Sequence, residues 1–229
     1  MSIIHRIVRR IVRDIRKQLR LRKARTAGIA YVAPDFIYWP RIKAGDTVID
    51  AGCSSQADFS LAMMDRYDAR SYAVDPTRKH RPALAALEAK HGGKLVHLPI
   101  AIGPTDGELT FHESEKNDSG SLMDDHTNVT SDQVVNYTVR AVTLQNLVKE
   151  LDSDRVAILK LDIEGAEYPL LRDATAEDLA AFDQIFIEFH HHAVVSYSEA
   201  DTKRIADRIV GMGFKSFSLD NHNYLFWRA

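Results

Sequence analysis

Acidic side chains directly after an apolar run are the clearest chemical signal in this sequence. Residues 156–159 read Val-Ala-Ile-Leu and lead into Lys-Leu-Asp-Ile-Glu-Gly-Ala-Glu at residues 160–167. In an open α/β sheet the ligand binds outside the carboxyl ends of the strands, which is where these acids fall. Asp162 and Glu164 are therefore candidates for binding an acceptor or removing a proton. Their simpler role, and the better one for Glu167, is to stabilise the start of a helix.

Two other predicted strands also end in aspartate. Asp50 and Gly52 follow the apolar residues 47–49, where a nucleotide-like ligand needs a tight turn and a close approach of the backbone. Asp75 ends the next strand and is placed to accept hydrogen bonds from a ribose diol. Because parallel strands present their carboxyl ends at one edge, we expect Asp50, Asp75 and Asp162 to converge on a single cleft.

Glu188 and His190 lie at the end of the predicted fifth strand. Side chains alternate along a strand, so these two share a face, and an imidazole that titrates near neutrality would let the pair act as a general base. Residues 190–192 are all histidine and, with Asp162 or Glu188, could also ligate a divalent metal. Three adjacent histidines cannot all face one ion from a regular strand, so we expect no metal site.

Strand and helix patterns alternate along the rest of the chain. Strands are predicted at 47–50, 71–75, 95–102, 156–162 and 184–190, helices at 59–67, 82–91, 143–151 and 199–212, and a closing hairpin at 214–219 and 224–227. This order predicts an α/β fold with a doubly wound, mostly parallel, seven-stranded Rossmann-like sheet and an antiparallel terminal hairpin. A short extra strand at 107–112 precedes a polar loop at 113–131, which we expect to cover the site as a lid, and residues 139–142 lead into the helix at 143–151.

The first 25 residues differ in charge from everything after them. They hold ten Lys or Arg and a single acid, Asp14, which leaves 20 bases and 31 acids, a formal charge of −11, in the remainder. An apolar residue recurs at every fourth position between these bases, at Ile3, Ile7, Ile11, Ile15 and Leu19. This is the pattern of an amphipathic basic helix. We therefore divide the chain into a basic N-terminal helix, 1–25, and one domain, 26–229.

Three kinds of contact suit such a helix. It can pack on its own domain or on a second subunit in a homodimer, or it can lie on an anionic membrane surface with its arginines at the headgroups. Nucleic acid is the weakest choice and we expect none, because no aromatic residue before Tyr31 interleaves with the bases. Cys53 is the only cysteine, and no apolar run approaches the roughly 20 residues that span a bilayer. We expect a cytoplasmic protein, peripheral at the inner membrane surface.

The motifs together resemble the FkbM-type family of S-adenosylmethionine-dependent methyltransferases. The matching segments are VIDAG at 48–52, AVDP at 73–76, AIG at 101–103, SGSL at 119–122, TLQNL at 143–147, KLDIEGAE at 160–167 and IEFH at 187–190. The resemblance implies the class I methyltransferase fold and S-adenosylmethionine as cofactor. It also implies O-methylation of a hydroxyl group on a sugar, a glycolipid or a natural product.

The resemblance also implies residue roles, position by position. Cofactor contacts are expected at the first turn, the second strand end and the third strand, from Asp50, Gly52, Cys53, Ser54, Asp75, Pro76, Ala101 and Ile102. Catalytic groups are expected at Asp162, Glu164, Glu188 and His190. The second glycine of the family's loop is missing from residues 53–58, which leaves a non-catalytic scaffold as an alternative. An NAD-dependent oxidoreductase is a second alternative, although its phosphate turn needs more glycines than Gly52 alone.

Overall fold

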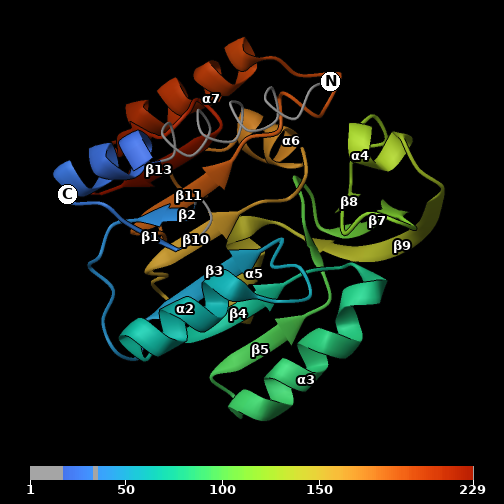
Figure 1. The fold of residues 1–229 in the computed structure, drawn as a ribbon, viewed down its shortest axis with the longest axis horizontal. Coiled ribbons are helices and arrows are strands. Elements are labelled where there is room, and N and C mark those ends of the chain that lie inside the picture. Colours follow the sequence, from blue (N-terminus) through green and yellow to red (C-terminus); the bar gives the residue numbers. More distant parts are fainter. Residues whose placement is uncertain (1–17, 33–35, 229) are drawn as a thin grey trace, which may run out of the picture.

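A mixed sheet of seven strands forms the centre of the protein in the computed structural model, which describes residues 18–32 and 36–228 (Figure 1). Its strands are β3 (Thr47–Ala51), β4 (Arg70–Val74), β5 (Leu95–Leu98), β10 (Ile158–Leu161), β11 (Gln184–Glu188), β12 (Lys215–Ser218) and β13 (Asn223–Trp227). Their order is β12-β13-β11-β10-β3-β4-β5. The strands from β11 to β5 pair in parallel, β13 pairs antiparallel with β11, and β12 pairs antiparallel with β13. The parallel strands therefore present their carboxyl ends at one edge, which we call the rim.

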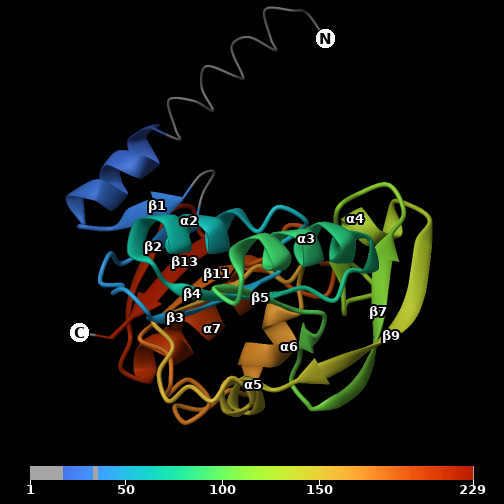
Figure 2. The same cartoon turned by 90° about the horizontal axis from the view of Figure 1, so that it is seen from below.

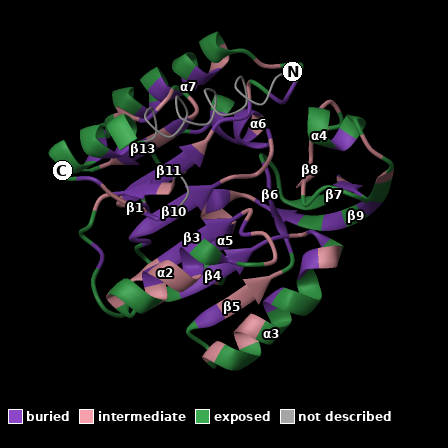
Figure 3. Ribbon diagram, in the orientation of Figure 1, coloured by how far each residue is buried: buried purple, intermediate pink, exposed green. Residues whose placement is uncertain are grey.

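Helices cover both faces of this sheet (Figure 2). One face carries α2 (Asp58–Tyr67) and α3 (Arg81–His91), and the other carries α5 (Leu144–Glu150), α6 (Glu167–Arg172) and α7 (Glu199–Gly211). The strands are mostly buried, whereas the outer sides of the helices are exposed (Figure 3). Val48 and Ile49 are both buried yet belong to different apolar clusters, because neighbouring side chains along a strand point to opposite faces. Burial on both faces explains why these strands read as continuous apolar runs.

A second sheet of four strands stands beside the first. Its order is β6-β9-β7-β8, formed by β6 (Ala101–Ile102), β7 (Gly107–Ser114), β8 (Gly120–Ser121) and β9 (Val134–Val142). The prediction of one strand over 95–102 is wrong, because Pro99 has no backbone N–H and separates β5 in the main sheet from β6 in the second. β7 and β9 pair from Gly107 opposite Ala141 to Ser114 opposite Val134, so β7 is longer than predicted and β9 is an additional strand. The polar segment 113–131 also contains β8 and the short helix α4 (Thr127–Thr130).

The end of the basic N-terminal helix packs on the domain. The chain is helical over residues 18–26, where Leu21 and Ala24 are buried. Arg20 forms an ion pair of 2.9 Å with Asp220, and the Lys23 ammonium lies 5.0 Å from the centre of the Phe217 ring. Both partners belong to the terminal β12–β13 hairpin and its turn, so this part of the helix contacts its own domain.

The earlier part of the predicted helix, residues 1–17, lies outside the described residues, as do the contacts predicted for it. After the helix, β1 (Ala30–Val32) and β2 (Phe36–Tyr38) form a small antiparallel pair where a cover segment was expected. Among the helices in the described ranges, none combines the length and apolar character needed to cross a membrane.

Candidate active site

Gly52 brings the end of β3 into contact with the residue that follows β10. Its φ of +72° is in the left-handed region, and its N–H donates to the carbonyl oxygen of Val74 at 2.9 Å. A Cβ atom here would lie 1.6 Å from the carbonyl oxygen of Asp162, so a larger residue fits only if the backbone moves. The tight turn predicted from VIDAG is therefore present and joins two strand ends at the rim.

Residues 53–58 fold without the missing second glycine. Ser54 and Ala57 take φ values of +53° and +48°, a conformation that costs a residue with a Cβ atom about 1 kcal/mol. Two hydrogen bonds of 3.0 Å hold the turn, one from Ala57 N–H to the carbonyl oxygen of Cys53 and one from Ser54 N–H to the carboxylate of Asp75. The loop is thus tied directly to the end of the neighbouring strand.

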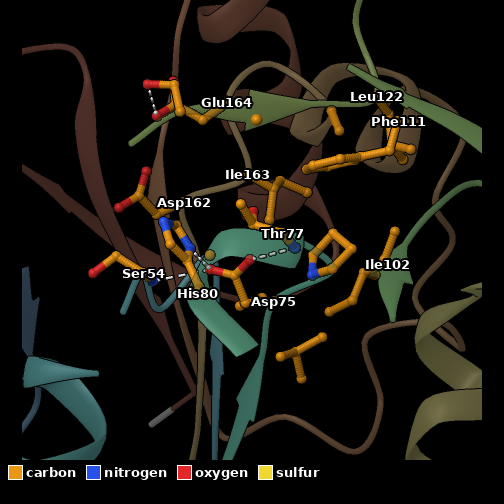
Figure 4. A pocket seen from close by; sticks show the side chains of 18 of the residues that line it. Ser54, Asp75, Thr77, His80, Ile102, Phe111, Leu122, Asp162, Ile163 and Glu164 are labelled. Carbon is orange, nitrogen blue, oxygen red and sulfur yellow. Dashed lines mark hydrogen bonds and ion pairs between the residues drawn. The ribbon is translucent and has the colours of Figure 1, made fainter. Parts of the chain in front are cut away.

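A cavity of about 170 Å³ opens at the rim (Figure 4). It is lined by most of the predicted cofactor-binding residues, namely Gly52, Ser54, Asp75, Pro76, Ala101 and Ile102. Two predicted catalytic residues, Asp162 and Glu164, also line it. The second sheet and the polar segment contribute Phe111, Ser119 and Leu122. One cavity therefore contains both the expected cofactor side and the expected acceptor side.

Asp75 is held in place by three donors. Its Oδ2 accepts hydrogen bonds from Ser54 N–H at 3.0 Å and from His80 Nδ1 at 3.1 Å, and its Oδ1 accepts one from Thr77 N–H at 2.9 Å. Burial alone would raise the pKa of Asp75, but the His80 and Thr77 bonds outweigh it and the pKa is lowered. The group is therefore a fixed, ionised acceptor at the cavity wall.

Asp50 does not line the cavity, and the prediction that it contacts the cofactor is corrected. Its Oδ2 accepts hydrogen bonds from the N–H and hydroxyl of Ser60 at 3.0 and 2.9 Å, and its Oδ1 lies 3.1 Å from the Lys160 ammonium. Because side chains alternate along β3, Asp50 points toward α2 while its neighbour Ala51 faces the cavity. Asp50 thus supports the rim from beneath.

Lys160 and Cys53 also lie beneath the rim. Lys160 donates a hydrogen bond of 2.9 Å to the carbonyl oxygen of Gly52 and lies 3.4 Å from Asp162 Oδ2. Burial would lower the pKa of Lys160, but Asp50 and Asp162 outweigh it and the pKa is raised. Cys53 is buried and does not line the cavity, so its predicted cofactor contact is corrected as well. Burial and the carboxylates of Asp50 and Asp75 raise the pKa of the Cys53 thiol, which makes it unreactive.

The other two predicted catalytic residues gather around Asp162. Neither Glu188 nor His190 lines the cavity, but both have a ligand-type atom within 4.8 Å of the Asp162 carboxylate. His190 Nε2 lies 3.5 Å from Asp162 Oδ1 and 3.6 Å from Glu164 Oε2, and its Nδ1 lies 3.0 Å from Glu167 Oε1. We call Asp162, Glu164, Glu167, Glu188 and His190 the acidic cluster.

The charges in the acidic cluster change how its members titrate. Burial would lower the pKa of His190, but Glu167, Glu164 and Asp162 outweigh it and raise the pKa to about 10. The pKa of this imidazole therefore lies above the near-neutral value expected from the sequence. Burial, with the nearby Asp162 carboxylate, raises the pKa of Glu188 to about 7. Burial also raises the pKa of Asp162.

Glu164 links the rim to the polar segment that we expected to act as a lid. Its backbone is left-handed, with φ of +53°, and its carbonyl oxygen accepts a hydrogen bond of 2.6 Å from the Ser121 hydroxyl. Its carboxylate accepts a bond of 3.1 Å from the Ser119 hydroxyl and lies 2.8 Å from His126 Nε2. The segment is thus fastened over the cavity through one residue of the KLDIEGAE motif.

Several residues of the site carried no signal in the sequence. His80 and Phe111 line the cavity, and His126 fastens the lid, yet each is an ordinary residue of a helix, strand or loop until the fold brings it to the rim. Lys160 lies inside the KLDIEGAE motif. The motif does not reveal that the Lys160 side chain is buried between Asp50 and Asp162.

A family model and several solved structures are similar to this chain. A family model described as the methyltransferase FkbM domain matches residues 54–216. A methyltransferase FkbM from Methylobacillus flagellatus KT superposes with a TM-score of 0.50 at 13% identity, over 82% of this chain and 44% of that chain. The fibrillarin/Nop5p complex gives 0.48 at 12% identity, over 82% and 75%. The Methanococcus jannaschii fibrillarin pre-rRNA processing protein gives 0.47 at 12%, over 88% and 71%. No curated protein matches the sequence.

Proposed function

Because the chain belongs to the FkbM methyltransferase family, we propose that it transfers a methyl group to a hydroxyl group of a sugar, a glycolipid or a natural product. The resemblance read from the motifs is confirmed at the level of the family. Family membership supports S-adenosylmethionine as the cofactor. The observation that carries the proposal is that Asp75 and Asp162 line the same cavity at the rim.

The cofactor side of the cavity fits a nucleoside attached to an amino acid. Gly52 lets the end of β3 lie against the carbonyl oxygen of Asp162, which a Cβ atom would prevent, and Asp75 offers a fixed carboxylate to a ribose diol. Ala101, Ile102 and Phe111 give an apolar surface for an adenine ring. When bound, the cofactor supplies a methyl group on a positively charged sulfur.

The acceptor side presents the carboxylates of Asp162 and Glu164 beside the hydroxyl of Ser119. Methyl transfer is an in-line displacement, so the protein must hold the acceptor oxygen in line with the methyl group and take up one proton. Asp162 and Glu164 line the cavity and are the groups that we assign to binding the hydroxyl and accepting its proton. The acceptor oxygen then gains the methyl group as the bond between carbon and sulfur breaks.

The loop at residues 53–58 supports an active enzyme over a non-catalytic scaffold. Ala57, near the end of the loop, takes the left-handed conformation that the absent glycine would adopt easily, and the cavity beside Ser54 stays open. The same loop offers little to a dinucleotide phosphate, because Gly52 is its only glycine.

Titration calorimetry of the full chain with S-adenosylmethionine and S-adenosylhomocysteine tests the proposal. We expect saturable binding that weakens at least about tenfold in Asp75→Asn, a loss of about 1.4 kcal/mol. Asp178→Asn is a matched control, because Asp178 also accepts several hydrogen bonds but lies outside the cavity. No heat change for either compound up to about 1 mM would refute the cofactor assignment. Release of S-adenosylhomocysteine with a panel of sugars, glycolipids and phenols then identifies the acceptor class.

We also propose that the basic N-terminal segment binds the enzyme to the cytoplasmic surface of the inner membrane. The support is its sequence, in which arginines alternate with isoleucine and valine over residues 1–17. Because residues 18–26 pack on the domain, the variant to compare lacks residues 1–17 alone. We expect the full chain to sediment with vesicles that contain anionic lipid and the shortened chain to stay in solution. Equal sedimentation of both would reject this location.

A further inference from the structure

We propose that Asp162, Glu188 and His190 bind a divalent metal ion at the edge of the methyl-transfer cavity. Each offers a ligand atom, a carboxylate oxygen or an imidazole nitrogen, and these atoms all lie within 4.8 Å of one another. An ion with bonds of about 2.1 Å holds its ligands about 3 to 4.2 Å apart, so a small contraction of the group would complete the site.

The orientation of His190 is that of a metal ligand. Its Nδ1 lies 3.0 Å from Glu167 Oε1, and its backbone N–H donates to the same oxygen at 2.8 Å. Glu167 is itself fully buried and also accepts the N–H of Gly165 at 2.9 Å. A ligating histidine usually gives its second nitrogen to a carboxylate in this way, because the contact fixes the ring and its tautomer.

The other ring nitrogen of His190 points to the acidic cluster without a hydrogen bond of its own to any described residue. The side chain is only 6% exposed, and the nearest oxygens, on Asp162 and Glu164, lie 3.5 and 3.6 Å from Nε2. These distances are too long for good hydrogen bonds. The gap between Nε2 and the carboxylates is where the ion would bind.

Charge also favours a cation at this point. Four carboxylates surround His190, those of Asp162, Glu164, Glu167 and Glu188. Lys160, the neighbouring ammonium group, is shared between Asp162 and Asp50. Buried carboxylates need a cationic partner. A divalent ion bound at Nε2 would take the place of the ring proton of His190 and supply two positive charges in place of one.

The reason for expecting no metal site does not apply to this geometry. It assumed that residues 190–192 would have to face one ion together, whereas only His190 joins the group. His191 Nδ1 lies 2.9 Å from the Thr202 hydroxyl, and its ring stacks on His222 with 4.5 Å between centres. Two carboxylates and one imidazole suit a first-row ion such as Mn²⁺, with further positions left for water or substrate oxygens.

The position of the ion suggests its use, which rests on the function proposed above. Asp162 lines the cavity, so an ion on its carboxylate would be within reach of an acceptor hydroxyl. The ion would bind the hydroxyl oxygen and make its proton easier to remove, and Glu164, which lines the cavity but is not a ligand, would take that proton. The oxygen then forms its bond to the methyl carbon as the carbon–sulfur bond breaks.

Electron paramagnetic resonance of Mn²⁺ added to the metal-stripped full chain tests the site directly. We expect one saturable Mn²⁺ per chain and an affinity at least about tenfold weaker in Glu188→Gln, since even an outer partner of a ligand gives such a loss. Glu150→Gln is the control, because Glu150 is an exposed carboxylate paired with Arg140. His190→Gln tests a second proposed ligand and should also bind Mn²⁺ more weakly, provided that its melting temperature stays near that of the wild type.

The same samples are titrated with S-adenosylmethionine, so that the two proposals fail separately. No saturable Mn²⁺ signal up to about 1 mM, or equal affinity in wild type and Glu188→Gln, would overturn the metal site whether or not cofactor binds. Mn²⁺ binding that depends on Glu188 supports the site, even in a protein that does not bind the cofactor.

Discussion

Lys160 donates a hydrogen bond of 2.9 Å from its ammonium group to the carbonyl oxygen of Gly52. The two residues are 108 positions apart and belong to the two motifs that carry most of the chemistry, VIDAG and KLDIEGAE. The same ammonium lies 3.1 Å from Asp50 and 3.4 Å from Asp162, so one buried cation holds both strand ends together. The rim is therefore held by buried ion pairs of Lys160 with Asp50 and Asp162, next to the cavity.

Replacing Lys160 tests how much its charge contributes to the free energy of unfolding. Lys160→Met keeps most of the volume but leaves Asp50 and Asp162 without their buried partner, so the free energy of unfolding should fall by about 3 to 5 kcal/mol. Urea denaturation followed by circular dichroism measures the change. Lys203→Met, in an exposed pair with Asp207, should stay within about 0.5 kcal/mol of the wild type. A loss below 1 kcal/mol in Lys160→Met would contradict this account, because a broken buried ion pair costs about 3 kcal/mol or more.

Gly52→Ala separates a steric clash from the cost of a left-handed backbone. The added Cβ atom would lie 1.6 Å from the Asp162 carbonyl oxygen, so we expect both stability and cofactor affinity to fall, the affinity at least about tenfold. Gly45→Ala is the matched control, since Gly45 has a similar φ of +80° but no atom within 4 Å of the new Cβ position. Thermal denaturation and calorimetry with S-adenosylhomocysteine provide the measurements. Equal losses in the two variants would show that the close approach to Asp162 does not matter.

Asp132 makes the polar segment sensitive to acid. The Ser114 hydroxyl and the N–H groups of Lys116 and Gln133 donate to its carboxylate and lower its pKa to about 2. Since the pKa in the unfolded chain is about 3.9, this stabilisation is complete above that pH and is lost as the pH falls toward 2.

The matching experiment compares wild type with Asp132→Asn by urea denaturation between pH 7 and pH 2.5. The gap in stability should be widest near neutrality and should shrink below about pH 4, because the wild type then becomes protonated as well. A gap that stays constant across this range would show that ionised Asp132 does not stabilise the segment.

His126 fastens the lid to Glu164. Its Nδ1 accepts the N–H of Asn128 at 3.3 Å, so its Nε2 carries the proton and faces Glu164 Oε2 at 2.8 Å. His126→Phe keeps the ring but removes both contacts, and amide exchange within residues 113–131 should become faster while β3 and β10 keep their protection. Hydrogen exchange with mass spectrometry measures this. His112→Phe, on β7, is the control and should leave exchange within residues 113–131 unchanged. Faster exchange in both variants would show that the contact between His126 and Glu164 does not hold the segment in place.

The sequence predicted the strands of the main sheet, most of the helices and the acids at the strand ends, because these depend on local patterns. Apolar runs, Gly52 and Pro76 mark where each strand stops, and parallel strands bring Asp75 and Asp162 to one cavity. The predicted strand over 95–102 failed where Pro99 divides it between two sheets. The same local signals were enough to indicate a methyltransferase of the FkbM family.

The tertiary structure alone decided which of these acids reach the cavity and which support it. Asp50 and Asp75 look alike in the sequence, yet the first turns toward α2 and the second toward the ligand space. The grouping of Glu188 and His190 with Asp162, and the burial of Lys160 under Gly52, join residues that are 26 to 108 positions apart. Such contacts depend on the order of the strands in the sheet and on the face of the sheet to which each side chain points. Neither can be predicted from the local sequence pattern.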